Sequence, residues 1–222
     1  MLCYISIHMI IAIACLKGGV GKSTVALNVG TCLHRAGHRV LLVDTDPQGT
    51  CRTWSAQAAE DETVDSPPVV AIEGKSLRRD LPRVAQGFDV SIIDTPPRMA
   101  VEARAAMMLA DVVVVPVTPG GADVWALQET LEVLEEARAL RPELKAVVVP
   151  NRMDRTTLAR LTRSALGETG AQVLEKGLGA RVAFGEATLA GQGVVDYQPR
   201  SPAAQEVEGL TRAILEAAGG GQ

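Results

Sequence analysis

A glycine-rich segment near the N-terminus constrains this chain more than any other feature. Its sequence is Lys17-Gly18-Gly19-Val20-Gly21-Lys22-Ser23-Thr24. It follows an apolar run at 9–15 that predicts a buried strand, and it precedes residues 25–36, which predict a helix. A strand, a glycine loop and a helix N-terminus in this order form a polyphosphate cradle, because backbone N–H groups can turn inward without a Cβ in the way.

Two side chains of this loop are suited to nucleotide chemistry. Lys22 can place its ammonium on the β- and γ-phosphates, and the Ser23 hydroxyl can ligate Mg²⁺. The loop departs from the pattern G-x-x-x-x-G-K-[ST], because Leu16 stands where the first glycine belongs and an extra lysine, Lys17, follows it. The alternative is a glycine turn that binds nothing, but two lysines and a Ser-Thr pair at these spacings argue against it.

Composition and charge limit the kinds of protein this chain can be. Its 222 residues suit one domain, and 47% hydrophobic with 22% charged residues is ordinary for a globular protein. The net charge is −4, so any contact with nucleic acid needs a local basic patch. The cysteines form no C-x-x-C pair, which argues against a disulfide framework, a zinc site or an iron–sulfur site and favours a reducing cytoplasm. They are Cys3, Cys15, Cys32 and Cys51.

Short apolar runs alternate with helical patterns along the chain. Runs that are apolar on both faces belong in a sheet covered on both sides, so we expect a doubly wound α/β fold with a mostly parallel sheet and helices on both faces. The predicted strands are residues 9–15, 39–44, 69–72, 88–94, 111–117 and 145–151. The predicted helices are residues 25–36, 101–109, 123–140, 156–168 and 201–217, and residues 60–68 predict an acidic loop.

We expect a single phosphate-loop domain over residues 1–218. Residues 1–8 lack the features of a signal peptide. We expect that they extend the first strand or that they precede a true start at Met9. Residues 219–222 are glycine-rich and predict a flexible tail.

Carboxylates close two of the predicted strands. Asp94 ends an apolar strand, as in a Walker B element, and would hold Mg²⁺ through a water. Asp44 ends the second strand, and Asp46 follows in the sequence DTDPQG. Because ligands bind at the carboxyl ends of parallel strands, we expect these groups to meet the phosphate loop. The alternative is that the aspartates only shape turns.

Several segments together resemble one known family. The extra lysine, Lys17, makes the chain resemble the deviant phosphate-loop ATPases, the family of ParA, MinD and the nitrogenase iron protein. The resemblance extends over the stretch 44–55 (DTDPQGTCRTWS), the stretch 110–120 (ADVVVVPVTPG) and residues 182–197. Within this family the chain is most similar to small ParA-type partition ATPases such as ParF. The resemblance implies that Lys17 reaches the nucleotide of a second subunit. It also implies that Asp46 orients the attacking water and joins Ser23 and Asp94 around the magnesium ion, with Asp44 in support.

The resemblance also suggests adenine and DNA contacts. Asn151 and Arg152 follow the last predicted strand, at a position that meets the base in this family, and an amide offers a donor and an acceptor to a purine. Non-specific DNA binding needs cations that contact phosphates, and Arg163, Arg181 and Arg200 are the candidates. An asparagine that ends a strand, or arginines on solvated faces, would be the plain alternatives.

The sequence therefore predicts an ATPase with ATP and Mg²⁺ as its ligands. The ParA resemblance implies an ATP-dependent sandwich homodimer that binds nucleoid DNA, positions a plasmid, chromosome region or protein complex, and is stimulated by a partner similar to ParB or ParG. It would be cytoplasmic and nucleoid-associated. One alternative is a MinD-like membrane-cycling ATPase, although the last helix has one basic residue and no aromatic, so no membrane contact is expected. Another is a metabolic enzyme such as a dethiobiotin-synthetase-like ligase.

Overall fold

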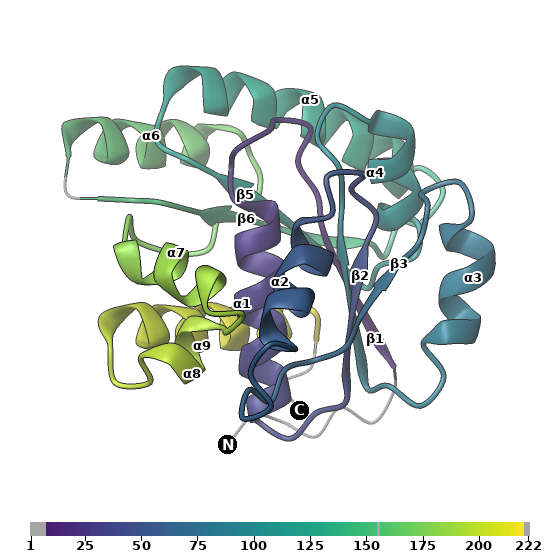
Figure 1. Ribbon diagram of the computed structural model, residues 1–222. Coiled ribbons are helices and arrows are strands. Elements are labelled where there is room, and N and C mark those ends of the chain that lie inside the picture. The colour runs from purple at the N-terminus through teal and green to yellow at the C-terminus, as the bar shows by residue number, and fades with distance from the viewer. Residues whose placement is uncertain (1–7, 155, 220–222) are drawn as a thin grey trace.

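The computed structural model describes residues 8–154 and 156–219. The predicted N-terminal extension and C-terminal tail lie almost wholly outside these residues. The described chain folds around a six-stranded sheet in the order β3-β2-β4-β1-β5-β6 (Figure 1). All neighbouring strands are parallel. The strands are β1 (Met9–Ile13), β2 (Val40–Asp44), β3 (Val69–Ala71), β4 (Val90–Asp94), β5 (Val112–Val117) and β6 (Lys145–Pro150).

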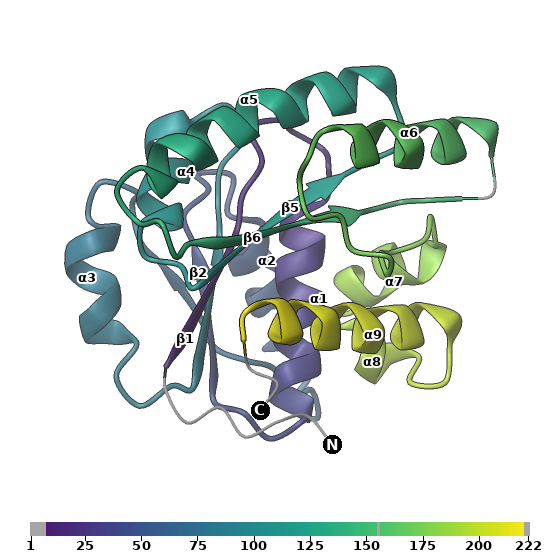
Figure 2. The same cartoon turned by 180° about the vertical axis from the view of Figure 1, so that it is seen from behind.

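Helices cover both faces of the sheet, as Figures 1 and 2 show from opposite sides. One face carries α1 (Lys22–Arg35), α2 (Thr50–Ala58), α7 (Val182–Leu189), α8 (Val194–Tyr197) and α9 (Pro202–Ala217). The other carries α3 (Leu77–Val84), α4 (Ala100–Met107), α5 (Gly121–Arg138) and α6 (Thr157–Glu168). The fold prediction is thus confirmed.

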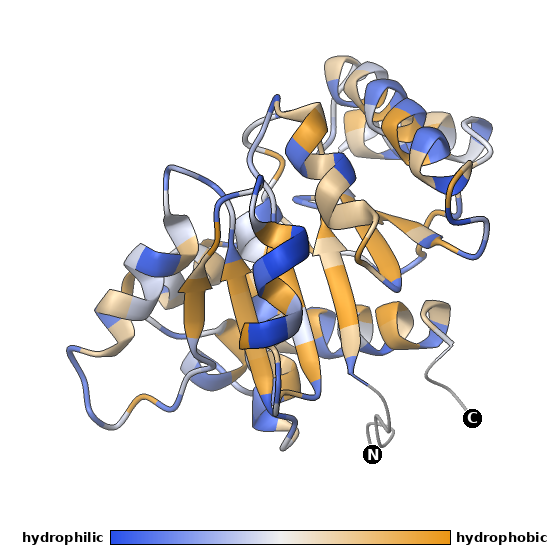
Figure 3. Cartoon of the chain, turned by 90° about the vertical axis from the view of Figure 1, so that its right-hand side faces the viewer, coloured by the Kyte–Doolittle hydropathy of each residue, from blue (hydrophilic) through white to orange (hydrophobic). Residues whose placement is uncertain are grey.

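The strand sequences explain the two layers. Successive side chains of a strand point to opposite faces, so an unbroken apolar strand supplies both cores at once. In β2, Leu42 packs in the core beneath α1, whereas Leu41 and Val43 pack in the core beneath α3 and α4. The strands are accordingly hydrophobic along their length (Figure 3). α1 lies close to β2 at Gly30, where a Cβ would lie only 2.7 Å from the side chain of Leu42. The absence of a Cβ therefore permits this approach.

The predicted helices and strands are present with small shifts at their ends. The Thr156 and Ser201 hydroxyls cap α6 and α9, and Pro202 stands in the first turn of α9. Four short helices, α2, α3, α7 and α8, were not predicted. In α3, Pro82 hides the helical pattern, although the helix buries Leu77 on its inner face.

None of the helices in the described residues is long and apolar enough to cross a membrane.

Candidate functional site

Three segments of the chain meet at the carboxyl edge of the sheet. β4 lies between β1 and β2, and its last residue, Asp94, pairs in register with Ile13 on one side and with Asp44 on the other. The phosphate loop leaves β1 just beyond Ile13, so the loop and both strand-end aspartates meet at one place. This is where ligands bind in open parallel sheets, as the sequence predicts.

The phosphate loop has the backbone that its glycines allow. Gly19 and Gly21 have φ angles of 77° and 89°, a region that residues with a Cβ rarely adopt. A Cβ at Gly21 would also lie 2.2 Å from the Asn151 amide nitrogen, so this position has no room for one. α1 begins at Lys22 with neither a side-chain cap nor an acidic residue in its first turn. Its free N–H groups and positive helix end therefore suit an anion.

Lys22 is buried inside this cradle. Its ammonium donates to the Lys17 carbonyl over 3.1 Å, which keeps it folded against the loop. Burial lowers the pKa of Lys22, while the negative charges of Asp94 and Asp46 act to raise it. A partly desolvated cation without a direct carboxylate partner is suited to bind phosphate oxygens.

Asp94 is buried at the base of the loop. One oxygen, Oδ2, accepts a hydrogen bond from the Cys51 thiol, and the other, Oδ1, has no hydrogen-bond partner in the described residues. Burial raises the pKa of Asp94 to about 6, and the charge of Asp44 adds to the rise, whereas the nearby Ser23 and Cys51 side chains act to lower it. An unsatisfied buried carboxylate oxygen beside Ser23 fits a hydrated magnesium ion.

The described residues contain no group of three or more His, Cys, Asp or Glu side chains placed to hold a metal by themselves. Mg²⁺ in nucleotide sites is seldom enclosed by protein ligands alone, because it keeps several waters and binds substrate phosphates.

The segment after β2 forms a turn beside the loop. Asp44 is buried and accepts from the backbone N–H groups of Asp46 and Arg52, so it fixes the path into α2. Asp46 is partly exposed, and its carboxylate accepts from the Gln48 N–H over 2.9 Å. Asp44 therefore holds the turn in place, and the Asp46 charge is close enough to act on the pKa of Lys22.

Lys17 stands at the rim of the loop. Its ammonium forms an ion pair with Asp123 of α5 over 2.8 Å, and its side chain is 32% exposed. Asp123 also accepts from the Thr118 hydroxyl over 2.6 Å. No sequence motif pointed to Asp123, because the stretch 110–120 that carries part of the family resemblance ends three residues before it.

Asn151 braces the loop from the neighbouring strand. Its side-chain nitrogen donates to the Val20 carbonyl over 2.7 Å, and its oxygen accepts from the Arg152 N–H over 2.9 Å. Both halves of the amide are therefore used inside the protein. Arg152 has a positive φ of 52°, a strained conformation for a residue with a side chain. The predicted contact of these residues with adenine stays a prediction.

The DNA candidates lie on the face that carries α7–α9 and on α6. Arg181 is paired with Glu206 over 2.6 Å, so its charge is compensated. Arg163, on α6, lines a hollow that also includes Lys176, Glu175 and Glu206. Arg200 lies in the exposed connection between α8 and α9. Of the three candidates, the structure compensates the charge of Arg181 most directly.

Other residues near the site carry no obvious motif. Thr130 of α5 accepts from the Leu16 N–H over 3.1 Å, and the Arg98 N–H donates to the Leu16 carbonyl over 2.8 Å. Thr95 donates through its hydroxyl to the Ile13 carbonyl over 2.9 Å.

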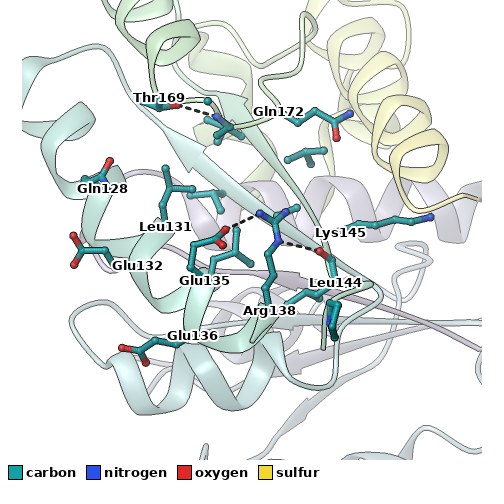
Figure 4. Close-up of a pocket in the computed structure, with 18 of the residues that line it drawn as sticks. Gln128, Leu131, Glu132, Glu135, Glu136, Arg138, Leu144, Lys145, Thr169 and Gln172 are labelled. Carbon is teal, nitrogen blue, oxygen red and sulfur yellow. Dashed lines mark hydrogen bonds and ion pairs between the residues drawn. The ribbon is translucent and has the colours of Figure 1, made fainter. Parts of the chain in front are cut away.

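Cavity size does not locate this site. A groove of about 1110 Å³ lies instead between α5 and the start of β6, where Arg138 bonds to Glu135 and to the Leu144 carbonyl (Figure 4). None of the residues that line it belongs to the phosphate loop. A smaller hollow of about 410 Å³ borders Asp44 and Asp46.

Comparison with known proteins agrees with this geometry. Residues 11–195 match the CobQ/CobB/MinD/ParA nucleotide binding domain. This chain belongs to that family. The predicted ATPase of the ParA and MinD type is thereby confirmed. This chain is 31% identical to the chromosome-partitioning ATPase Soj of Thermus thermophilus, over 92% of this chain and 94% of Soj. It is 29% identical to the maintenance of carboxysome distribution protein A of Halothiobacillus neapolitanus, over 92% and 95% of the two chains.

Solved structures share the fold. MinD of Pyrococcus horikoshii, complexed with Mg-ADP, superposes with a TM-score of 0.74 at 21% identity and covers 96% of this chain and 98% of its own. Cobyrinic acid a,c-diamide synthase of Mycobacterium smegmatis, with bound ATP analogue and magnesium, gives 0.75 at 24% identity over 95% of each chain. Because the fold is common to a cell-division protein and a biosynthetic enzyme, fold alone does not separate their functions.

Proposed function

We propose that this chain is a ParA-type ATPase whose ATP-bound form is a sandwich dimer that binds DNA without sequence preference. Hydrolysis, stimulated by a partner protein similar to ParB or ParG, returns it to the monomer. Repeated cycles on the nucleoid position a cargo. The proposal is supported by the site geometry together with relatives, 29% and 31% identical, whose names concern chromosome partitioning and carboxysome distribution.

ATP and Mg²⁺ are the proposed ligands of the site. The turned glycine backbone and the start of α1 would hold the phosphates, with Lys22 among them. Ser23 would ligate the magnesium ion, and Asp94 would hold one of its waters through the free oxygen. The ion would offset the negative charge of the phosphates. Asp46, which is partly exposed beside the loop, would orient the attacking water.

The placement of Lys17 carries the dimer proposal. Lys22 is 6% exposed within the loop, whereas Lys17 lies at its rim with a third of its side chain exposed. One subunit needs only one buried lysine at its own phosphates. A second lysine at the rim is therefore placed to contact phosphates that approach from another subunit across the same face.

DNA binding would use the surface that the dimer presents. Contacts with DNA phosphates need cations whose charge is not already compensated. Arg163 and Arg200 meet this condition better than Arg181, which Glu206 pairs over 2.6 Å. With a net charge of −4 the chain is not a polycation, so DNA contact would need a basic surface built by local clustering or by two subunits together.

The membrane-cycling alternative is disfavoured by α9. Its apolar face is already buried against α1 and the sheet, with Val207, Leu210 and Ile214 in the core. A helix that binds lipid needs an apolar face free to enter the interface. A biosynthetic role shares the fold but would need a small substrate for ATP turnover.

Sedimentation velocity with ADP and with ATP tests the dimer, and gel shifts with random-sequence DNA at two salt concentrations test the DNA contact. The proposal expects a dimer and salt-sensitive DNA binding only with ATP. Lys17→Ala is the matched variant: it should still bind ATP yet remain monomeric. A monomer in ATP with equal DNA affinity in both nucleotides would refute the proposal, and ATP-dependent binding to liposomes instead would revive the membrane alternative.

A further inference from the structure

The pair between Lys17 and Asp123 joins the phosphate loop to a distant helix of the same subunit. Their charged atoms are 2.8 Å apart, and the Asp123 side chain is only 11% exposed. The Thr118 hydroxyl donates to the same carboxylate oxygen over 2.6 Å. The pair is thus part of a small polar network and more than a loose surface contact.

The structure holds Asp123 in place independently of Lys17. Asp123 stands in the first turn of α5, where the positive end of the helix favours a carboxylate. Gly120 caps this helix without a side chain, and a Cβ there would lie 2.6 Å from the free oxygen of Asp123. The Gly120 N–H in turn donates to Thr162 of α6 over 3.1 Å. The carboxylate is therefore held by contacts that do not depend on Lys17.

We infer that Asp123 is a positioning residue that keeps Lys17 in its own subunit until nucleotide binds. This inference rests on the proposed function, in which Lys17 contacts the nucleotide of a second subunit. One ammonium on a single side chain has to leave the Asp123 carboxylate before it reaches phosphates across an interface. The ion pair therefore competes with dimer formation in each of the two subunits.

Lys22 offers a route by which nucleotide would loosen the pair. In the structure the Lys22 ammonium is bound to the Lys17 carbonyl over 3.1 Å. Phosphate oxygens would compete for that ammonium, because charge-assisted bonds to phosphate are stronger than bonds to a neutral carbonyl. The backbone of Lys17 would then lose an anchor while its side chain remains held only by Asp123.

A purely structural role for the pair makes the opposite prediction. If the ion pair only ties α5 to the loop, Asp123→Asn should weaken the monomer and leave dimer formation unchanged or poorer. If it retains Lys17, the same change should make dimers form more readily. Asparagine keeps the size of the side chain and can still accept from Thr118, so the substitution removes mainly the charge.

The experiment measures the dimer dissociation constant by sedimentation in saturating ATP for the wild type, Asp123→Asn and Asp123→Glu. A partly exposed ion pair is worth up to about fivefold in an equilibrium constant, so Asp123→Asn should tighten the dimer up to about 25-fold for two subunits. Asp123→Glu keeps the charge and should stay near the wild type. Denaturation of the nucleotide-free single and double variants of Lys17→Met and Asp123→Asn measures the coupling directly.

The outcomes separate this inference from the proposed function. Dimers that tighten in Asp123→Asn, together with coupling in the nucleotide-free protein, support it. Unchanged or weaker dimers, or absence of coupling, overturn it even if the wild type dimerises as proposed. If the wild type stays monomeric in ATP while Asp123→Asn dimerises, the result supports retention of Lys17 by Asp123 and refutes the proposed dimerisation of the wild type. If neither dimerises, both fail.

Discussion

The Cys51 thiol donates to Oδ2 of Asp94 over 3.4 Å, and both side chains are buried. Burial raises the pKa of Cys51 well above its usual range, so the thiol keeps its proton and remains a donor. It thereby occupies one oxygen of Asp94, whereas Oδ1 has no hydrogen-bond partner in the described residues. A cysteine at the start of α2 thus helps to orient a carboxylate that ends β4.

Asp94→Asn should stabilise the nucleotide-free protein at pH 7. The pKa of Asp94 is raised to about 6, so the folded state holds a proton that the unfolded state releases at lower pH. The stabilisation of the folded state by this retained proton is fully present below pH 4 and is lost as the pH rises through 6. Removing the buried charge should add on the order of 3 kcal/mol to the free energy of unfolding at pH 7.

Urea denaturation at pH 7 and pH 4 measures this effect, and the gain should vanish at pH 4, where the wild-type carboxyl is neutral. Binding of ATP with Mg²⁺ should weaken in the same variant. Equal stability of the two proteins at pH 7 would show that Asp94 is not strained by its burial.

Lys22→Ala should abolish nucleotide binding. The change removes the buried ammonium at the phosphate cradle, so affinity for ADP and ATP should fall at least about 100-fold, as expected for a charge-assisted contact. Isothermal titration calorimetry measures it. Lys176→Ala, a lysine in another hollow, is the control and should bind normally. Unchanged affinity in Lys22→Ala would rule out this site.

Asp46→Ala should trap an ATP-bound dimer. Without the group that orients water, hydrolysis should slow at least about 100-fold while ATP still binds, since general acid–base assistance is commonly worth that much. Phosphate release and sedimentation in ATP measure the two effects. Asp46→Asn retains an acceptor for the Gln48 N–H, so it controls for the shape of the turn. A variant that is monomeric in ATP with normal turnover would contradict the assigned role.

Asn151→Ala should weaken ATP and GTP equally. The amide holds the Val20 carbonyl over 2.7 Å, and loss of one buried hydrogen bond should reduce affinity for both nucleotides about tenfold. Asn151→Asp, which cannot donate to Val20, should behave alike. If ATP affinity falls much more than GTP affinity, the amide instead contacts the adenine base.

Arg163→Ala and Arg200→Ala should weaken DNA binding more than Arg181→Ala does. The logarithm of DNA affinity falls linearly with the logarithm of salt concentration. Removing one uncompensated arginine that contacts a DNA phosphate should make this slope shallower by about one. Arg181 is already paired with Glu206. Glu206→Gln should release Arg181 and strengthen DNA binding, as gel shifts over a range of salt concentrations can measure. Weaker DNA binding in Glu206→Gln would place the DNA elsewhere.

Some features follow from local sequence alone. The glycines of the loop, the apolar strands and the aspartates that end β2 and β4 predicted a doubly wound sheet with a polyphosphate site at one edge. Such predictions succeed because conformational freedom, apolar periodicity and strand-end position are properties of neighbouring residues. They fail for short helices such as α3, because Pro82 and three arginines obscure its helical pattern. Its apolar face is stabilised only by packing against the rest of the fold.

The sequence alone thus predicted which residues could bind phosphate and at which edge of the sheet they lie. The tertiary structure decided which residues orient them: Asp123 for Lys17, Cys51 for Asp94 and Asn151 for the loop backbone. Each partner comes from a different element, and a hydrogen bond or ion pair depends on distances of about 3 Å that sequence spacing does not fix. Packing of the helices on the parallel sheet brings these pairs together, including the ion pair between Lys17 and Asp123.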